Sequence, residues 1–267
     1  MSGNSRTVIG FDLYGTLLST ESIAEELAKI FGEDKAQSVA AQWRRYQLEY
    51  TWRINSMGKG CCRPPFYLAS IPMLMFTNYF PGMYRSFSEI TRGALLHAVA
   101  EADLSLAPGD ADRLMTAYDS LHVFPEIPAA LKAVADNKSI EAYIFTNGTN
   151  EMAKASVETS PDLGPHAATF KGLITVDELE AFKPDQRTYD HLLSKTGKER
   201  NTGQVWVVSA NPFDAVGAKA AGLESAWVDR AGKGWIDRLG DVIGGIRPTV
   251  VVSGVDEAIS EISRRIL

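Results

Sequence analysis

Short apolar runs alternate with amphipathic segments over much of this chain. Five of the runs have the length and β-branched content of buried strands, at residues 8–13, 142–146, 173–176, 205–209 and 225–228. Helical spacing of the apolar positions lies between later runs, at residues 151–158, 186–195 and 213–221. This alternation predicts an α/β fold, a doubly wound, Rossmann-like parallel sheet.

A long stretch without strands separates the first apolar run from the second. In "AQSVAAQWRRYQLEYTWRINSM" apolar residues recur every three or four positions, which predicts a long helix with one apolar face. Another helix is expected after Ser86, because Glu89 follows at the spacing of a capping box. We therefore expect a core built from residues 1–18 and 125–267, with a helical cap, residues 19–124, inserted between its two parts.

Composition narrows the class of protein. The chain has 267 residues, 45% of them hydrophobic, and a net charge of -6. A net negative charge argues against a nucleic-acid-binding surface, so we expect no nucleic-acid partner. Its two cysteines, Cys61 and Cys62, are adjacent, and no apolar leader precedes the first strand, which together favour a reducing, cytoplasmic location.

Residues 59–82, "KGCCRPPFYLASIPMLMFTNYFPG", follow neither a helical nor a strand period. The stretch between Arg63 and Arg85 carries no charge and has the length of a membrane span. Pro72, Asn78 and Pro81 interrupt it, so we expect no membrane contact. We interpret the segment as a retained intron translated in frame, because codons for its ends and for Thr77-Asn78 can contain splice donor, branch and acceptor sequences. A genuine lineage-specific loop is the alternative.

Polar residues follow the predicted strands where each one ends. In chain order they are Asp12 and Thr16, Thr146 and Asn147, Lys183, then Ser209, Asn211 and Asp214. The carboxyl ends of parallel strands meet at one edge of a sheet, so these side chains are expected to converge there. Each has an ordinary explanation when taken alone: a helix cap for the aspartates, a turn for Thr146 and Asn147, and a solvated lysine for Lys183.

The joint pattern resembles the haloacid dehalogenase superfamily. "FDLYGTL", "FTNGTN", "FKPDQRTY" and "VSANPFDAVGA" have the order and strand-end positions of its motifs, over nearly the whole chain. Tyr14 occupies the position of the second aspartate of the phosphatases, and Ser209 that of a metal-ligating acid. Halide leaves without a proton, so the chain is most similar to the L-2-haloacid dehalogenase branch. "WRRYQLEYTW" resembles the cap motif of that branch.

The resemblance implies a role for each of these residues. Asp12 attacks C2 of an L-2-haloacid and forms an aspartyl ester, which a water activated by Asp214 hydrolyses to a D-2-hydroxyacid without a metal or other cofactor. Lys183 keeps Asp12 charged, and Arg44 holds the halide and the substrate carboxylate. The remaining catalytic residues are Thr16, Ser209 and Asn211, and the substrate-binding residues are Tyr14, Thr146, Asn147, Leu48, Phe87, Phe213 and Tyr189.

Several positions depart from that branch and leave substrate size open. Arg45 replaces a common glutamine, Thr146 and Ala210 replace serines, and Phe213 replaces a tryptophan. A Mg²⁺-dependent phosphatase of the same fold and a catalytically impaired binding protein stay as alternatives. Relatives commonly dimerise through the cap, which implies a homodimer here.

Overall fold

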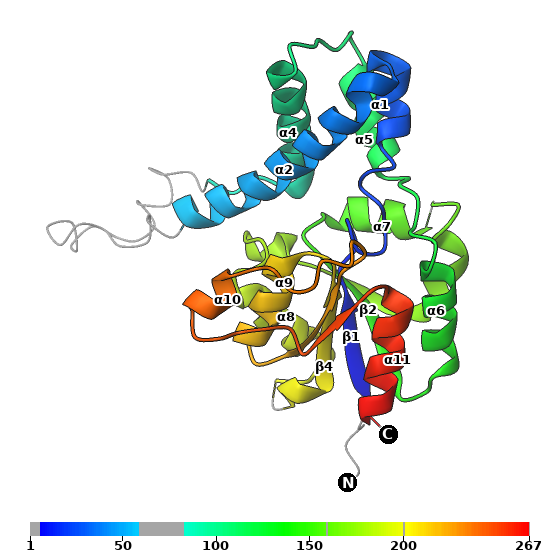
Figure 1. Ribbon diagram of the computed structural model, residues 1–267, viewed down its shortest axis with the longest axis vertical. Helices are drawn as coiled ribbons and strands as arrows, with labels where there is room; N and C mark the ends of the chain where they lie inside the picture. Colours follow the sequence, from blue (N-terminus) through cyan, green and yellow to red (C-terminus); the bar gives the residue numbers. More distant parts are fainter. Residues whose placement is uncertain (1–5, 59–82, 159, 200, 267) are drawn as a thin grey trace, which may run out of the picture.

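The molecule consists of a sheet-containing core beneath a group of helices that forms a cap (Figure 1). The computed structural model describes residues 6–58, 83–158, 160–199 and 201–266. The first strand begins and the last helix ends at the side of the core opposite the cap (Figure 1). The proposed limits of core and cap stay predictions, and residues 59–82, including the interpretation as an intron, lie outside the described residues.

The core is built on one six-stranded parallel sheet in the order β3-β2-β1-β4-β5-β6. The strands are β1 (Thr7–Phe11), β2 (Ile140–Thr146), β3 (Phe170–Thr175), β4 (Val205–Ser209), β5 (Glu224–Val228) and β6 (Val250–Val252). All five residues of β1 are buried, because strands on both sides and helices on both faces cover it. The predicted doubly wound α/β fold is confirmed, while β6 was missed because it has only three residues at the sheet edge.

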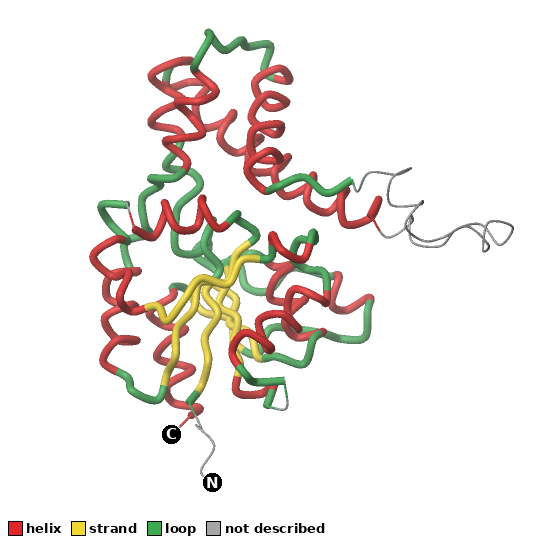
Figure 2. The backbone as a smooth tube through the Cα atoms, turned by 180° about the vertical axis from the view of Figure 1, so that it is seen from behind, coloured by secondary structure: helices red, strands yellow, loops and turns green. Residues whose placement is uncertain are grey.

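Helices cover both faces of this sheet, as Figures 1 and 2 show from opposite sides. They are α6 (Ile127–Asp136), α7 (Asn150–Glu158), α8 (Gln186–Thr196), α9 (Pro212–Ala220), α10 (Leu239–Val242) and α11 (Val255–Ile266). Single 3₁₀ turns η2 (Gly164–Thr169), η3 (Asp177–Leu179) and η4 (Thr202–Gln204) complete the connections. Their alternation with the strands places every carboxyl strand end toward the cap.

The cap contains helices α1 (Ala24–Phe31), α2 (Glu33–Gly58), α4 (Phe87–Glu101) and α5 (Asp110–Tyr118). The long α2 packs against α1 and α4, and the Trp43 indole N–H donates a hydrogen bond of 2.8 Å to the Thr91 carbonyl of α4. The predicted capping box at Ser86 and Glu89 is present. No helix within the described ranges is long and apolar enough to cross a membrane.

Two chain segments join core and cap, and they lie side by side. Leu18 on the way out forms an antiparallel bridge with Val123 on the way back. The Ser19 N–H donates to the His122 carbonyl at 2.8 Å, and the Phe124 N–H donates to the Leu17 carbonyl at 3.2 Å. The connection is therefore a short two-stranded ribbon.

Candidate active site

The Asp12 carboxylate lies directly after β1 and is almost fully buried. Its Oδ2 accepts hydrogen bonds from the Thr16 hydroxyl at 2.6 Å and the Asn211 amide at 2.8 Å, with the Ser209 hydroxyl at 3.4 Å. Its Oδ1 accepts from the Lys183 ammonium at 2.9 Å. Donors from four separate positions therefore fix the orientation of one carboxylate.

Lys183 lies between two carboxylates with its side chain only 1% exposed. Its ammonium donates to Asp12, to Asp214 Oδ2 at 2.7 Å and to the Phe145 carbonyl at 3.0 Å. Burial disfavours the charged ammonium, but the negative charges of Asp12 and Asp214 outweigh burial, and the pKa of Lys183 is raised. The predicted surface-lysine alternative is therefore wrong.

Asp214 lies in the first turn of α9 and is fully buried. The Tyr189 hydroxyl donates to its Oδ1 at 2.9 Å, on the side away from Lys183. Burial, and to a lesser degree the charge of Asp12, raises the pKa of Asp214 against the opposing effect of Lys183. A carboxylate with a raised pKa is a stronger base, which is what water activation requires.

The loop after β4 is bonded to the loop after β1. The Ala210 N–H donates to the Thr16 hydroxyl at 2.9 Å, and the Asn211 N–H donates to the Ser209 hydroxyl at 3.1 Å. Thr16 and Ser209 thus accept one hydrogen bond while their own hydroxyls point to Asp12. The two loops hold the Asp12 carboxylate between them.

Thr146 and Asn147 shape the end of β2. The Thr146 hydroxyl accepts the Gly148 N–H at 3.1 Å, and the Asn147 amide oxygen accepts the main-chain N–H of Lys183 at 2.8 Å. Both contacts are made within the protein. That main-chain N–H groups around these residues bind the substrate carboxylate stays a prediction.

Arg44 reaches from α2 of the cap to the strand ends. Its guanidinium donates to the Tyr14 carbonyl at 2.8 Å, to the Asn211 amide oxygen at 3.3 Å and to Gln47 Oε1 at 2.7 Å. The next residue, Arg45, points the other way, with a side chain 55% exposed and paired with a glutamate of α4. The geometry thus brings Arg44, not Arg45, to the site.

Tyr14 forms part of an aromatic wall beside Asp12. Its ring lies 5.8 Å from that of Phe87 and 5.5 Å from that of Tyr118. A Cβ at Gly148 would lie 2.9 Å from the Tyr14 ring, so only glycine allows this close approach. The Tyr14 hydroxyl bonds to Ser156 at 3.2 Å, and burial raises the pKa of Tyr14, so Tyr14 does not serve as an acid beside the nucleophile.

Phe213 and Leu48, which are also predicted to bind substrate, lie at the boundary of cap and core. The Phe213 ring, in α9, meets Trp52 of α2 edge-on at 5.4 Å. Leu48 lies one turn beyond Arg44 on the same face of α2, half-buried. Tyr189 is placed behind Asp214, where it positions this carboxylate, and direct contact of these residues with substrate stays a prediction.

Sequence reasoning missed several residues that support the site. Gln47 is fully buried, accepts from Arg44 and from the Tyr118 hydroxyl at 3.1 Å, and donates to Thr91 at 2.6 Å. Asn55, further along α2, bonds to the main chain directly before Lys183. The signal that could have identified Gln47 is a polar residue on the apolar face of an amphipathic helix.

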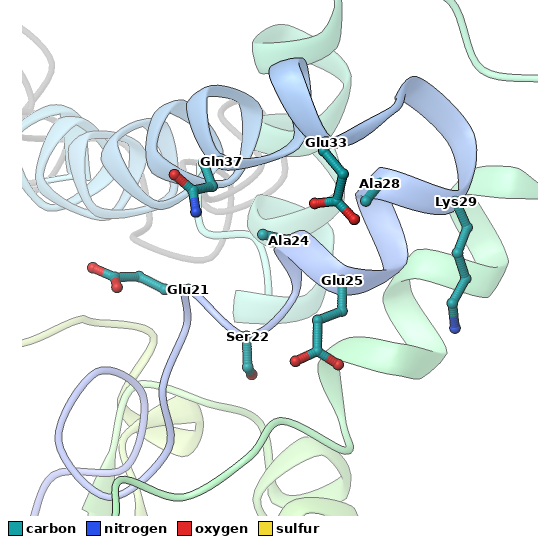
Figure 3. Close-up of a pocket in the computed structure, with 8 residues that line it drawn as sticks. All are labelled: Glu21, Ser22, Ala24, Glu25, Ala28, Lys29, Glu33 and Gln37. Carbon is teal, nitrogen blue, oxygen red and sulfur yellow. The ribbon is translucent and has the colours of Figure 1, made fainter.

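A hollow of about 580 Å³ in the cap is separate from this constellation (Figure 3). It lies between α1 and the start of α2, and the carboxylates of Glu21, Glu25 and Glu33 give it an acidic lining. None of the predicted site residues lines it, so it takes no part in the chemistry considered below.

The comparison with known proteins assigns the class. The model of the haloacid dehalogenase-like hydrolases matches residues 7–222, and the chain belongs to this family of hydrolases. It is 32% identical over 232 residues to haloacetate dehalogenase H-2 of Moraxella sp. (strain B), covering 87% of this chain and 89% of that protein. It is 28% identical over 227 residues to an (S)-2-haloacid dehalogenase of Pseudomonas sp. (strain YL), covering 84% and 83%.

Solved structures resemble the whole chain. The L-2-haloacid dehalogenase of Xanthobacter autotrophicus superimposes with a TM-score of 0.75 at 24% identity, over 97% of this chain and 98% of that one. The same enzyme with chloropropionic acid covalently bound gives 0.75 at 23% identity, with the same coverage. The confirmed fold therefore includes the cap as well as the core.

Proposed function

We propose that the protein hydrolyses the carbon–halogen bond of short-chain L-2-haloacids and releases D-2-hydroxyacids. The observation that carries this proposal is the buried Asp12–Lys183–Asp214 group, in which one ammonium bonds both carboxylates. The named relatives support it, since they include a haloacetate dehalogenase and several (S)-2-haloacid dehalogenases.

In the first step an Asp12 carboxylate oxygen attacks C2 of the substrate from the side opposite the halogen. The new C–O bond makes an ester at Asp12, and the electron pair of the broken bond leaves with the halide. Lys183 and the donors on Oδ2 hold the carboxylate ready for attack. The wall that contains Tyr14 offers no proton, and a halide needs none.

In the second step Asp214 takes a proton from a water, which adds to the ester carbonyl of Asp12. The Cγ–O bond to the substrate breaks, and the departing oxygen takes the proton held by Asp214, so the hydroxyacid leaves with an Asp12 oxygen. The water oxygen stays on Asp12, which returns to its carboxylate as the second water proton is released to solvent. Because C2 is attacked only once, its configuration inverts. The raised pKa of Asp214 supports its role as the base.

Arg44 binds two anions, the substrate carboxylate and the departing halide. Its guanidinium already donates to oxygens of Tyr14 and Asn211 next to Asp12. A planar group with several N–H donors can hold a carboxylate and a departing halide together. This role makes the cap part of the reaction site.

We propose that the reaction needs no metal. The carboxylates of Asp12 and Asp214 are both bonded to Lys183, which supplies the positive charge between them. The described residues contain no group of three or more His, Cys, Asp or Glu side chains placed to hold an ion. This donor set disfavours the Mg²⁺-dependent phosphatase alternative.

The decisive experiment measures halide release from each enantiomer of 2-chloropropionate, with and without EDTA. We expect release from the L enantiomer only, undiminished by EDTA, with D-lactate as product. Hydrolysis of p-nitrophenyl phosphate that requires Mg²⁺ would support the phosphatase instead. A folded, monodisperse protein with neither activity would support the impaired binding protein.

Three further expectations accompany this function. A homodimer through the cap is tested by sedimentation, and a cytoplasmic location by fractionation of the source cells. Sequencing the mature messenger tests the interpretation of residues 59–82, because codons for them in the spliced transcript would exclude an intron.

A further inference from the structure

One face of α2 touches three loops at the strand ends. Arg44 contacts the loop after β1, Trp52 meets the start of α9 after β4, and Asn55 bonds to the loop after β3. The first two contacts belong to the anion site and to the wall. Asn55 touches no atom placed to react, and its contact is of a different kind.

Asn55 bonds to both main-chain polar groups of a single core residue. Its Oδ1 accepts the Phe182 N–H at 2.9 Å, and its Nδ2 donates to the Phe182 carbonyl at 2.6 Å. A side-chain amide has a separate acceptor and donor, so it fixes the peptide groups on both sides of Phe182. The Phe182 ring is fully buried and stacks on cap residue Tyr84 at 5.2 Å.

Phe182 immediately precedes Lys183 in the loop of residues 176–184, here called the Lys183 loop. A second cap residue holds its other end, since the Tyr84 hydroxyl donates to Asp177 at 2.5 Å. The Lys183 main chain is bonded to Asn147 of the core, and its ammonium to Asp12 and Asp214. A displacement at Phe182 is therefore passed over one peptide bond to the lysine between the two carboxylates.

We propose that Asn55 is a positioning residue, which couples the placement of the cap to the placement of the Lys183 ammonium between Asp12 and Asp214. Its effect on turnover rests on the proposed function, and its hold on the loop does not. Small displacements of catalytic groups reduce rates strongly, because attack requires aligned atoms. The groups that face the ammonium are Asp12 and Asp214, with Tyr189 behind Asp214.

The test compares Asn55→Ala with Gln42→Ala, using halide release from L-2-chloropropionate. Gln42 is the matched control, because it is an amide on the same helix whose side chain bonds to Glu101 within the cap. Asn55→Ala is expected to lower kcat about tenfold while KM changes less than about twofold, since Arg44 still binds the anion. The acidic limb of the kcat/KM profile moves to higher pH, because a displaced Lys183 no longer opposes the raised pKa of Asp214.

Hydrogen–deuterium exchange supplies a readout that does not depend on turnover. The amides of the Lys183 loop should exchange about tenfold faster in Asn55→Ala and at the wild-type rate in Gln42→Ala. If the alanine variant does not fold, Asn55→Asp keeps the size and the acceptor but loses the donor, and smaller changes in the same directions are expected.

Unchanged exchange in a folded Asn55 variant would overturn the proposal. Faster exchange with an unchanged kcat and acidic limb would equally overturn it, because the loop would then be held without positioning the lysine. If the wild-type protein releases no halide, the proposed function fails, and exchange alone decides whether Asn55 holds the loop.

Discussion

The strand ends of the core and the core-facing side of α2 contribute in different ways to the same site. In the core, the charged atoms of Asp12, Lys183 and Asp214 are buried and bonded to one another. The face of α2 carries one charge, on Arg44, and it also carries Trp52 and Asn55, whose partners belong to the core. In the proposed reaction the core supplies the reacting groups, and the cap contacts the loops that hold them.

This difference has an energetic side. Removing the charge of one member of a buried ion group leaves the others without full compensation, so catalysis there should be sensitive to each substitution. A hydrogen bond from α2 to a loop of the core contributes about 1 kcal/mol to the free energy of unfolding. Changes in the core should therefore abolish chemistry, while changes on α2 should reduce it in graded steps.

The largest effect is expected for Asp12→Asn, which keeps the shape and loses the nucleophile. Halide release should fall by at least about 10⁴-fold, with the fold intact by circular dichroism. With wild-type enzyme in excess and H₂¹⁸O as solvent, one turnover should label Asp12 and not the product. Label in the first-turnover product would mean that water attacks C2 directly.

Next in size is the contrast between two adjacent cap arginines. Arg44→Lys keeps the charge but loses the planar fork, and kcat/KM should fall about 100-fold. Arg45→Lys, on the exposed side of α2, should change it less than about twofold. Equal effects in a halide-release assay would show that the wrong arginine has been assigned.

A smaller effect is expected at Ser156, which fixes the hydroxyl of the wall residue Tyr14. Ser156→Ala leaves that buried hydroxyl without its partner, costing about 1–3 kcal/mol of unfolding free energy. The freed ring should also accept longer chains, raising kcat/KM for 2-chlorobutyrate relative to chloroacetate by about threefold.

The control for this change is Tyr14→Phe combined with Ser156→Ala, which removes both partners. If the double variant is less stable than Ser156→Ala alone, the hydroxyl bond is not the cause of the loss. Thermal unfolding measures the stabilities, and competition between the two substrates measures the preference.

The smallest effect concerns Asp119, which follows α5 beside the connection to the core. Its Oδ1 is buried without a hydrogen-bond partner among the described residues, and burial raises its pKa to about 6. The folded protein therefore binds more protons than the unfolded chain between about pH 4 and 6, and stability falls as pH rises through this range.

Asp119→Asn should remove this loss of stability at higher pH. Because Asp119 is half-buried, we expect the Tm of the variant to exceed that of the wild type by only about 2 °C at pH 8 and to match it at pH 3.5. Asp112→Asn, on the exposed side of α5, should show no such gain. A gain at pH 3.5 as large as that at pH 8 would contradict the protonation argument.

The same division explains what could be predicted from the sequence. Asp12 and Ser209 could be predicted because a polar residue at the end of a buried apolar run is easily recognised, and parallel topology brings such strand ends together. Gln47 and Tyr118 could not be predicted, because their partners lie on different cap helices and helical spacing does not show which polar groups meet.

Asn55 shows the limit most clearly. An asparagine near the end of a helix usually faces water, and its partner lies 127 positions away in the chain. β6 could not be predicted for another reason, since a run of three valines at a sheet edge is too short to show the alternation of a strand. Cap contacts that no strand end marks, and elements of minimal length, are thus what the pattern leaves out.

The paired ribbon between core and cap has a mechanical consequence. Segments bonded through Leu18 and Val123 resist twisting against each other, so any tilt of the cap would turn about a single line along the ribbon. Arg44 bonds to the chain close to that line, and Asn55 lies 11 residues further along α2, or about 16 Å. A tilt of a few degrees therefore leaves the arginine nearly in place and carries Asn55 away from Phe182 first. The same movement that releases a product anion would free Lys183 from its position between Asp12 and Asp214. The return of the cap would restore that position before the next substrate reacts.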